Sequence, residues 1–233
     1  MVAAGEVVPS LRAGGGGLIA GAPEKWAYRM GFRRVAGVDE AGRGALAGPL
    51  VAAAVIFPEE GDRALLELLA DSKELSPSRR EELFGPILEM AESWSFACVP
   101  PWVIDRGGLQ EANASALREA VLGLDPPPDL VLVDYFRLPG LGIPQWSLVH
   151  ADRLSRCVAA ASILAKVIRD RLMLSWWVRY PEYGFENHKG YGTRQHLRAL
   201  AAHGPTPGHR GSFRGVLQLE MGMGVEGELP WER

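Results

Sequence analysis

Four acidic residues stand where a predicted strand ends or a predicted helix begins: Asp39, Glu40, Asp134 and Asp152. A carboxylate at the rim of an apolar sheet is costly to bury unless its charge is balanced, and carboxylates that meet there raise one another's pKa. A divalent cation removes this conflict, and oxygen-only ligands suit Mg²⁺ or Mn²⁺ rather than zinc. Two such ions about 3.5–4 Å apart activate a water and stabilise the leaving oxygen in phosphodiester hydrolysis. The four acids together therefore predict a metal site for that chemistry.

Asp39 and Glu40 are adjacent, which poses a geometric problem because successive residues of a strand point to opposite faces. Both reach one metal site only if the backbone turns between them or just after them. The turn Gly42-Arg43-Gly44 follows at once and permits this. For any single acid, capping a strand or facing solvent is the simpler explanation, so the prediction depends on all four together.

Apolar runs and helical spacing define the elements that must position these acids. We expect strands at residues 33–39, 50–57, 94–99 and 130–134, a candidate fifth strand at 145–150, and helices at 77–90, 109–124 and 153–178. Ser76 is the expected N-cap of the first helix, with Pro77 as its first residue. Strands come first as a hairpin-like pair and then alternate with helices, which favours a mixed α/β sheet with helices on both faces.

The composition is that of a soluble globular protein, with 233 residues of which 47% are hydrophobic and 23% charged. No apolar run approaches the roughly 20 residues that a membrane span needs, and the start of the chain does not resemble a signal peptide. Cys98 and Cys157 lie far apart without a CxxC partner, so we expect two reduced thiols rather than a disulfide or a zinc site. These features predict a cytoplasmic protein with a flexible leader.

A basic segment is hidden by the net charge of −3. Between Lys166 and Arg214 there are nine basic residues against three acidic ones, with seven aromatic residues interleaved. This pattern suits a surface that binds phosphates and stacks on sugars or bases. A solvated helical region whose aromatic residues belong to the core explains it equally well.

Five ordered blocks of sequence resemble the ribonuclease HII family. They are GVDEAGRG at 37–44 with LAGPLVAAAV at 46–55, DSKELS at 71–76, Asp152 with SILAKV at 162–167 and RDRLM at 169–173, YPEYGF at 180–185 with HKGYGT at 188–193, and HRGSF at 209–213. The blocks span residues 35–213 in the family's order and spacing. A glycine-rich turn by itself is weak evidence, whereas five ordered blocks are strong evidence.

The resemblance implies an α/β fold, namely an RNase H-like mixed sheet flanked by helices, with a small helical C-terminal region. We expect a flexible leader at 1–24, a catalytic domain at 25–178, a basic helical substrate-binding region at 179–220 and a tail at 221–233. The resemblance also implies that the catalytic residues, which bind Mg²⁺ or Mn²⁺, are Asp39, Glu40, Asp134 and Asp152.

Members of this family hydrolyse the RNA strand of RNA–DNA hybrids. They also nick duplex DNA on the 5′ side of a lone ribonucleotide, leaving 3′-hydroxyl and 5′-phosphate ends, which implies a role in ribonucleotide excision repair. A backbone turn reads the 2′-hydroxyl and a tyrosine stacks on the neighbouring deoxyribose, and these roles map onto Gly42, Arg43, Gly44 and Tyr191. Further candidates for substrate binding, for each of which an exposed lysine is the simpler explanation, are Lys73, Lys166 and Lys189. We expect a monomer without a membrane partner.

Two residues depart from the family pattern beside the acids. Tyr135 follows Asp134 where the family usually has glycine, and Ala151 precedes Asp152 where the family again usually has glycine. Each replacement could shift a carboxylate, and Asp134 is the ligand that depends most on its place at a strand end.

Three other functions remain as alternatives. A junction resolvase with the same carboxylate chemistry would cut branched DNA and ignore the 2′-hydroxyl. A non-catalytic binding protein would lack a carboxylate, and none is missing. A Rossmann-type nucleotide binder would need a third glycine at the fingerprint spacing and a later ribose-binding acid. The sequence that follows the glycines at 42 and 44 has neither.

Overall fold

The computed structural model describes residues 22–60, 69 and 75–216. Most of the predicted leader, the predicted tail and Lys73 lie outside these residues. Within them, no helix is both long enough and apolar enough to cross a membrane.

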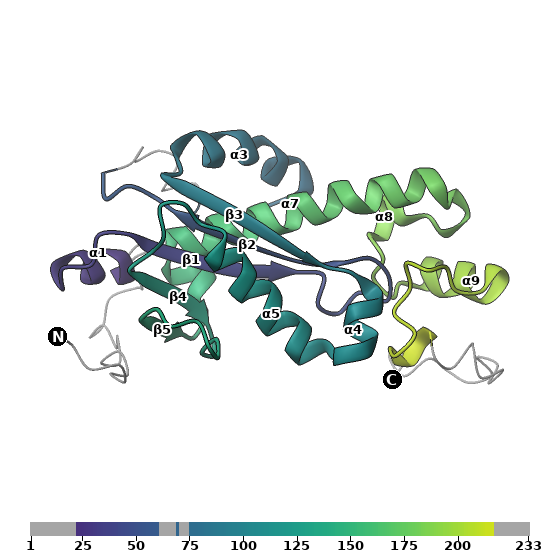
Figure 1. The fold of residues 1–233 in the computed structure, drawn as a ribbon. Coiled ribbons are helices and arrows are strands. Elements are labelled where there is room, and N and C mark those ends of the chain that lie inside the picture. The colour runs from purple at the N-terminus through teal and green to yellow at the C-terminus, as the bar shows by residue number, and fades with distance from the viewer. Residues whose placement is uncertain (1–21, 61–68, 70–74, 217–233) are drawn as a thin grey trace, which may run out of the picture. The chain divides into compact units, whose positions relative to one another are not determined.

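Five strands form one mixed sheet (Figure 1), as the sequence predicts. They are β1 (Val35–Ala41), β2 (Leu50–Ile56), β3 (Ser93–Val99), β4 (Leu130–Asp134) and β5 (Gln145–Leu148), in the spatial order β3-β2-β1-β4-β5. The pair β1–β2 is antiparallel, whereas β1–β4 and β4–β5 are parallel. Because β2 and most of β4 are buried along their length, their near-continuous apolar sequences are those of strands covered on both faces.

Three longer helices match the predicted ones: α3 (Pro77–Met90), α5 (Leu109–Leu122) and α7 (Arg156–Arg179). The Ser76 side chain caps α3 by accepting from the backbone N–H of Arg79, as expected. A Cβ placed on Gly37 of β1 would lie 2.2 Å from the backbone nitrogen of Val158, so the start of α7 packs against β1 at a distance that only glycine permits.

The chain divides into two compact units. Unit 1 comprises residues 1–41, 51–97 and 114–167, and unit 2 comprises residues 42–50, 98–113 and 168–233. The sheet lies almost wholly in unit 1, with the first half of α7. Unit 2 holds the glycine-rich turn, the second half of α7 and most of the basic segment. The predicted boundary at residues 178 and 179 stays a prediction.

Shorter helical segments complete the described part of the fold; the last three lie in the region 179–220 that was predicted to be helical, and the first three were not predicted as separate helices. They are α1 (Ala22–Arg29), α4 (Pro101–Gly107), α6 (Ala151–Leu154), α8 (Phe185–His188), α9 (Arg194–His203) and a 3-10 turn at Pro181–Tyr183. The end of the predicted leader is therefore helical. Glu24 is buried there, and its Oε1 accepts from the Ser155 hydroxyl at 2.6 Å and from the Cys157 backbone N–H at 3.0 Å. The predicted start of the long helix at 153 is also corrected, because Ser155 interrupts it.

The end of β4 contains a strained backbone. Tyr135, directly after Asp134, has φ 68°, and the backbone N–H of Phe136 donates to the Asp134 carbonyl at 2.9 Å. This is a γ-turn with a positive φ at its centre, the rarer and more strained form. The Tyr135 side chain is 77% exposed, so little packing offsets the strain. The sequence departure at this position therefore has a backbone cost that glycine would not incur.

We expect Tyr135→Gly to raise the free energy of unfolding by roughly 1 kcal/mol, because glycine removes the left-handed strain and loses little contact. Urea unfolding of the purified variant measures this. Tyr135→Ala is the control, because alanine keeps the Cβ and should give no such gain. A Tyr135→Gly protein no more stable than the alanine variant would show that the turn is unstrained.

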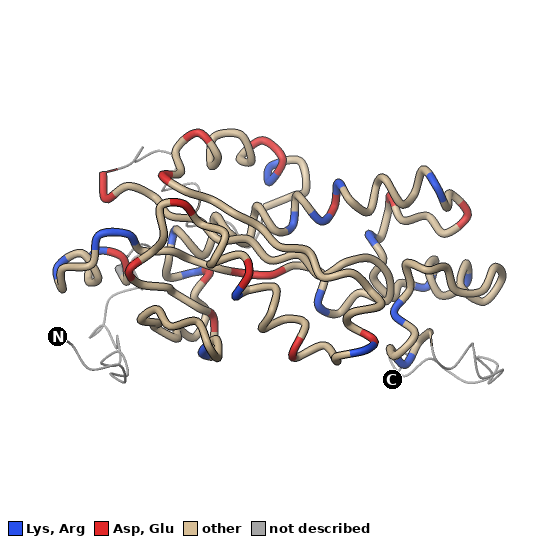
Figure 2. Tube along the Cα trace, in the orientation of Figure 1, with Lys and Arg blue, Asp and Glu red and all other residues tan. Residues whose placement is uncertain are grey.

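Unit 2 has its own apolar core, which includes Tyr183 and Phe185 with Trp176 packed against them. Tyr180 joins them, with its ring stacked on Trp176 and edge-on to Tyr183, so four of the seven aromatic residues of the basic segment belong to this core or pack against it. Basic residues recur along α7 and α9 (Figure 2), but Arg169 and Arg210 are buried. The explanation by core packing therefore holds for part of this segment, and binding of phosphates by its exposed basic residues stays a prediction.

Three histidines line this core. His196 and His209 lie with their Nε2 atoms 3.0 Å apart, and the His188 ring stacks on His196 with centroids 4.5 Å apart. Burial, with a smaller contribution from the neighbouring histidines, lowers the pKa of His196 and of His209 to about 4. The folded protein thus holds both rings neutral at neutral pH.

This burial predicts a loss of stability in mild acid. The folded-state pKa of about 4 lies below the ordinary value of 6.5, so the unfolded chain takes up protons first as the pH falls. Above pH 6.5 the two histidines cost the folded state nothing by their ionisation. Toward pH 4 the free energy of unfolding should fall by several kcal/mol, since each histidine contributes about 1.4 kcal/mol per pKa unit of its shift. Urea unfolding at several pH values measures it. His209→Gln should flatten the dependence, whereas His203→Gln, at an exposed histidine, should not; equal slopes in all three proteins would contradict the assignment.

Candidate active site

Two of the predicted acids lie on neighbouring parallel strands: Asp134 ends β4, whereas β1 continues two residues beyond Asp39 to Ala41, past the predicted strand end at 39. Val38 of β1 pairs with Val133 of β4, so Asp39 and Asp134 come next on each strand at the same edge of the sheet. Oδ1 of Asp134 accepts a hydrogen bond at 2.9 Å from the backbone N–H of Ala151. Ala151 begins α6, whose second residue is Asp152. The Asp134 carboxylate thus ties the end of β4 to the helical turn that carries the fourth acid.

The Asp39 carboxylate has a perturbed ionisation. Burial, with a smaller contribution from the negative charge of Asp152, raises its pKa to about 6. Hydrogen bonds from Ser162 and from the Glu40 backbone, together with the positive charge of Lys166, oppose this rise. The Lys166 ammonium donates to the Ser162 hydroxyl at 2.8 Å. Lys166 therefore supports the carboxylate through Ser162, a residue that sequence reasoning did not single out.

Glu40 differs from Asp39 in its direction. Pairing with β2 continues through Asp39, Glu40 and Ala41, so the backbone turns only after the two acids and their side chains leave opposite faces of the sheet. The Oδ1 atom of Asp152 is buried and accepts no hydrogen bond from the described residues, although the residue has other interactions.

These carboxylates fit a divalent cation by their chemistry. They offer only oxygen atoms, and the Asp39 carboxylate, which is partly buried, loses solvation that a nearby cation would offset. Across residues 22–60, 69 and 75–216, no group of three or more His, Cys, Asp or Glu side chains is already close enough to hold a metal ion. The assignment of the four ligands stays a prediction.

The glycine-rich turn, residues 42–49, belongs to unit 2 and is held by buried arginines. Arg169 donates to the carbonyl oxygens of Pro49 and Ala47 at 3.0 and 3.1 Å. Arg210 donates to the Gly48 carbonyl at 2.9 and 3.1 Å and to the Arg43 carbonyl at 3.0 Å. Counted at first among the basic residues of a possible phosphate surface, these two arginines bind backbone instead, and no sequence signal separates them from exposed arginines.

The two glycines of the turn have different environments. Gly42 has φ 88°, and a Cβ on it would lie 1.9 Å from Nε of Arg169. Gly44 is exposed, and a Cβ there would meet no atom within 4 Å. The Arg43 side chain donates to Oε1 of Gln110 at 3.0 Å. Gly42 is therefore required by the fold of the turn, whereas Gly44 is not.

Tyr191 is partly exposed in the same unit, at 43%, and the Arg169 guanidinium lies 5.1 Å from the centre of its ring. The Lys189 ammonium donates to the Glu186 carbonyl, so this candidate phosphate ligand is engaged within the protein. The turn and Tyr191 thus share Arg169 as a support.

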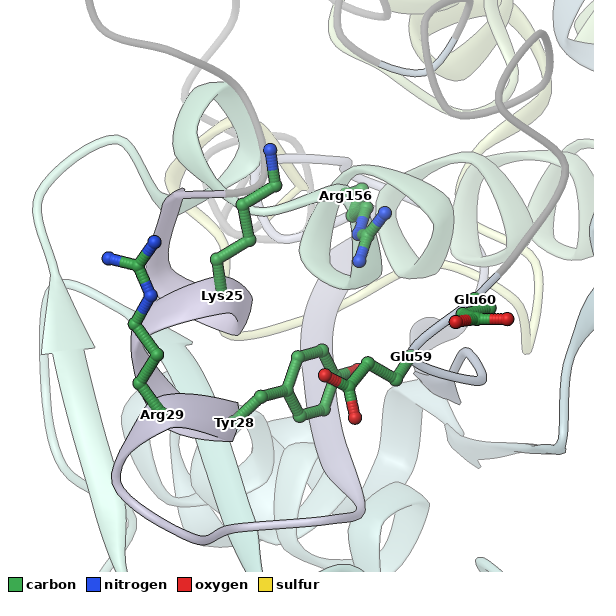
Figure 3. A pocket seen from close by; sticks show the side chains of 6 residues that line it. All are labelled: Lys25, Tyr28, Arg29, Glu59, Glu60 and Arg156. Carbon is green, nitrogen blue, oxygen red and sulfur yellow. The ribbon is translucent and has the colours of Figure 1, made fainter.

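A cavity of about 390 Å³ lies elsewhere in unit 1 (Figure 3). Its lining residues are Lys25, Tyr28, Arg29, Glu59, Glu60 and Arg156. It contains none of the predicted site residues, and its charges are mixed in sign, so it does not alter the assignment of the site.

Comparison with known proteins assigns the family. The family model described as Ribonuclease HII matches residues 36–216. Ribonuclease HII of Salinispora tropica is 47% identical over 210 residues, covering 90% of this chain and 76% of the relative, and that of Pelotomaculum thermopropionicum is 52% identical over 187 residues, covering 80% and 70%. The crystal structure of ribonuclease H2 from Pyrococcus horikoshii OT3 superposes with a TM-score of 0.71 at 28% identity, covering 81% of this chain and 97% of that one. With the mixed sheet and the carboxylates at its edge, these matches establish that the chain belongs to the ribonuclease HII family and is an RNase H-like endoribonuclease of RNA–DNA hybrids.

Proposed function

We propose that the enzyme also nicks duplex DNA on the 5′ side of a single embedded ribonucleotide, and that it cuts both substrates through Asp39, Glu40, Asp134 and Asp152 with Mg²⁺ or Mn²⁺. The main support is Asp39, which lies at the sheet edge beside Asp134. Burial, together with the charge of Asp152, raises the pKa of Asp39 to about 6. Carboxylates with strongly perturbed pKa values cluster at functional sites. We propose in addition that it acts as a cytoplasmic monomer in ribonucleotide excision repair.

The mechanism follows from what each group can hold. Two bound divalent cations would supply an attacking water of lowered pKa and would neutralise charge on the departing 3′-oxygen. Ser162 and Lys166 keep the Asp39 carboxylate oriented and charged through their hydrogen-bond chain. Asp134 holds the start of α6 and with it Asp152. Because water attacks rather than the 2′-hydroxyl, the products carry 3′-hydroxyl and 5′-phosphate ends and no cyclic phosphate forms.

Recognition of the ribonucleotide is assigned to unit 2. Only the 2′-hydroxyl distinguishes RNA from DNA at one position, and a backbone without a Cβ approaches it most closely. Gly42, Arg43 and Gly44 supply that backbone, and the partly exposed Tyr191 supplies a ring to stack on the next deoxyribose. Lys73 lies outside the described residues, and Lys166 is assigned here to the carboxylates rather than to phosphate.

The first prediction concerns the carboxylates. Asp39→Asn and Asp134→Asn should each reduce cutting of a duplex with one ribonucleotide by about 100-fold or more in Mg²⁺, because each removes a charged ligand. Product mapping on a denaturing gel measures rate and end chemistry. In EDTA, Asp39→Asn should be more stable than the wild type at pH 7.5, by about 3 kcal/mol, because the folded state no longer has to ionise a carboxyl whose pKa is raised from 3.8 to about 6.

The stability measurement separates loss of chemistry from loss of folding. Undiminished cutting by either variant, or cutting by the wild type in EDTA, would contradict the assignment. An all-DNA duplex and a branched DNA junction are the matched substrates. Cutting of the junction with indifference to the ribonucleotide would instead favour a resolvase.

The second prediction uses the two glycines as a matched pair. Gly44→Ala should leave stability within about 0.5 kcal/mol, because a Cβ there meets open space, and should reduce cutting at the ribonucleotide about tenfold. Gly42→Ala should instead lose about 3 kcal/mol or more of stability, because its Cβ displaces Arg169 from two carbonyl oxygens. Urea unfolding and initial rates measure both effects. A Gly44→Ala enzyme of full activity would argue against close backbone reading at residue 44.

A further inference from the structure

The histidines of unit 2 form a chain of hydrogen bonds with one possible direction. Nδ1 of His209 accepts from the backbone N–H of Thr206 at 2.9 Å, so the proton of this neutral ring is on Nε2. That Nε2–H donates across 3.0 Å to Nε2 of His196. The remaining proton of His196 is therefore on Nδ1, and it donates to the carbonyl oxygen of Tyr191 at 3.0 Å. Every tautomer in this relay, Thr206–His209–His196–Tyr191, follows from one backbone donor.

His188 holds the other side of the same loop. Its Nδ1 accepts from the backbone N–H of Gly190 at 3.2 Å, and its Nε2 donates to the Tyr183 carbonyl at 2.8 Å. Its own carbonyl accepts from the backbone N–H of Tyr191 at 2.9 Å. Histidines therefore bind the backbone on both sides of Tyr191.

The loop is also fixed at its base. The Gly190 carbonyl accepts from the backbone N–H groups of Leu46 and Ala47 at 2.9 and 3.2 Å, and the Tyr191 carbonyl accepts a second bond from Thr193 at 2.8 Å. The ring of Tyr191 is nevertheless 43% exposed, with Arg169 over it. The backbone of Tyr191 is thus held by hydrogen bonds while its ring stays exposed to solvent. This arrangement is expected of a side chain that is positioned in advance to bind a ligand.

We propose that His196 and His209 are positioning residues, which set the Tyr191 ring for substrate through the relay to its carbonyl oxygen. The proposal rests on the proposed role of Tyr191 in stacking on the substrate. Both histidines are buried, and their ring nitrogens bind protein groups of unit 2. Their effect should therefore appear in substrate binding, with the chemical step at saturating substrate unchanged.

Two substitutions of His196 separate this role from core packing. In His196→Asn the side-chain amide nitrogen takes the place of Nδ1, so it keeps the donor to Tyr191 and loses the link to His209. In His196→Gln the amide reaches the place of Nε2, so it keeps the link to His209 and loses the donor to Tyr191. Both remove the same imidazole from the core and its stacking on His188.

The measurement is kcat and KM on a duplex with one ribonucleotide, with urea unfolding of each variant as the check on folding. We expect His196→Gln to raise KM about tenfold with kcat within about twofold, and His196→Asn to keep KM within about threefold of the wild type. In a Tyr191→Ala background the effect of His196→Gln on KM should disappear, since the ring that it positions is gone. Equal rises of KM in the two His196 variants, or an undiminished effect in the Tyr191→Ala background, would overturn the proposal.

The tautomers give a test that is independent of activity. Long-range ¹H–¹⁵N spectra of the protein near pH 7.5 should place the ring proton of His209 on Nε2 and that of His196 on Nδ1. A His196 proton on Nε2 would overturn the relay even in an active enzyme. A wild-type protein that does not cut the duplex but has the expected tautomers would instead refute the proposed function of Tyr191 and leave the relay standing.

Discussion

Inward-facing carbonyl oxygens are the constraint on which unit 2 depends. The turn at residues 42–49 directs four of them at two buried guanidinium groups, those of Arg169 and Arg210. A buried carbonyl without a donor destabilises the fold, and few side chains offer several donors in one plane. Burial, followed by repulsion from Arg169, lowers the pKa of Arg210 to about 10, so it remains protonated at neutral pH. The turn thus exists in this form because two positive charges are kept inside the protein.

Unit 1 contains the complementary case. The Asp39 carboxylate is desolvated and repelled by Asp152, and Ser162, Lys166 and a backbone N–H oppose this. Such a site is less stable than an apolar one of the same shape, which is the usual relation between activity and stability. Tyr135 adds backbone strain directly after Asp134. Folding energy from the buried strands therefore supports an edge of the sheet that is unfavourable by itself.

Much of this organisation could be predicted because it is local. Apolar runs that end in an acid predicted β1 and β4 with the positions of Asp39 and Asp134, and Ser76-Pro77 predicted the start of α3. The rest depends on contacts distant in sequence. Helix α1 depends on Glu24 reaching Ser155 and Cys157, a pairing that a short window of sequence does not contain.

The same limit explains the basic segment. Arginine is usually exposed, and nothing beside Arg169 or Arg210 in the sequence indicates that carbonyl oxygens more than 100 residues away surround them. Aromatic residues were equally ambiguous, since Tyr183 belongs to the core and Tyr191 is partly exposed. The sequence identified Tyr135 as an unusual residue. The positive φ that makes this residue strained is a property of the folded backbone and could not be predicted from the sequence.

Gly37 has a consequence beyond packing. It stands two residues before Asp39 on the same face of β1, and the backbone of α7 fills the space where its side chain would be. Ser162, one turn further along α7 than Val158, donates to the Asp39 carboxylate. Because residue 37 has no side chain, α7 can pack close to the sheet. Gly37 therefore sets the distance between α7 and β1, and with it whether the Ser162 hydroxyl reaches the Asp39 carboxylate.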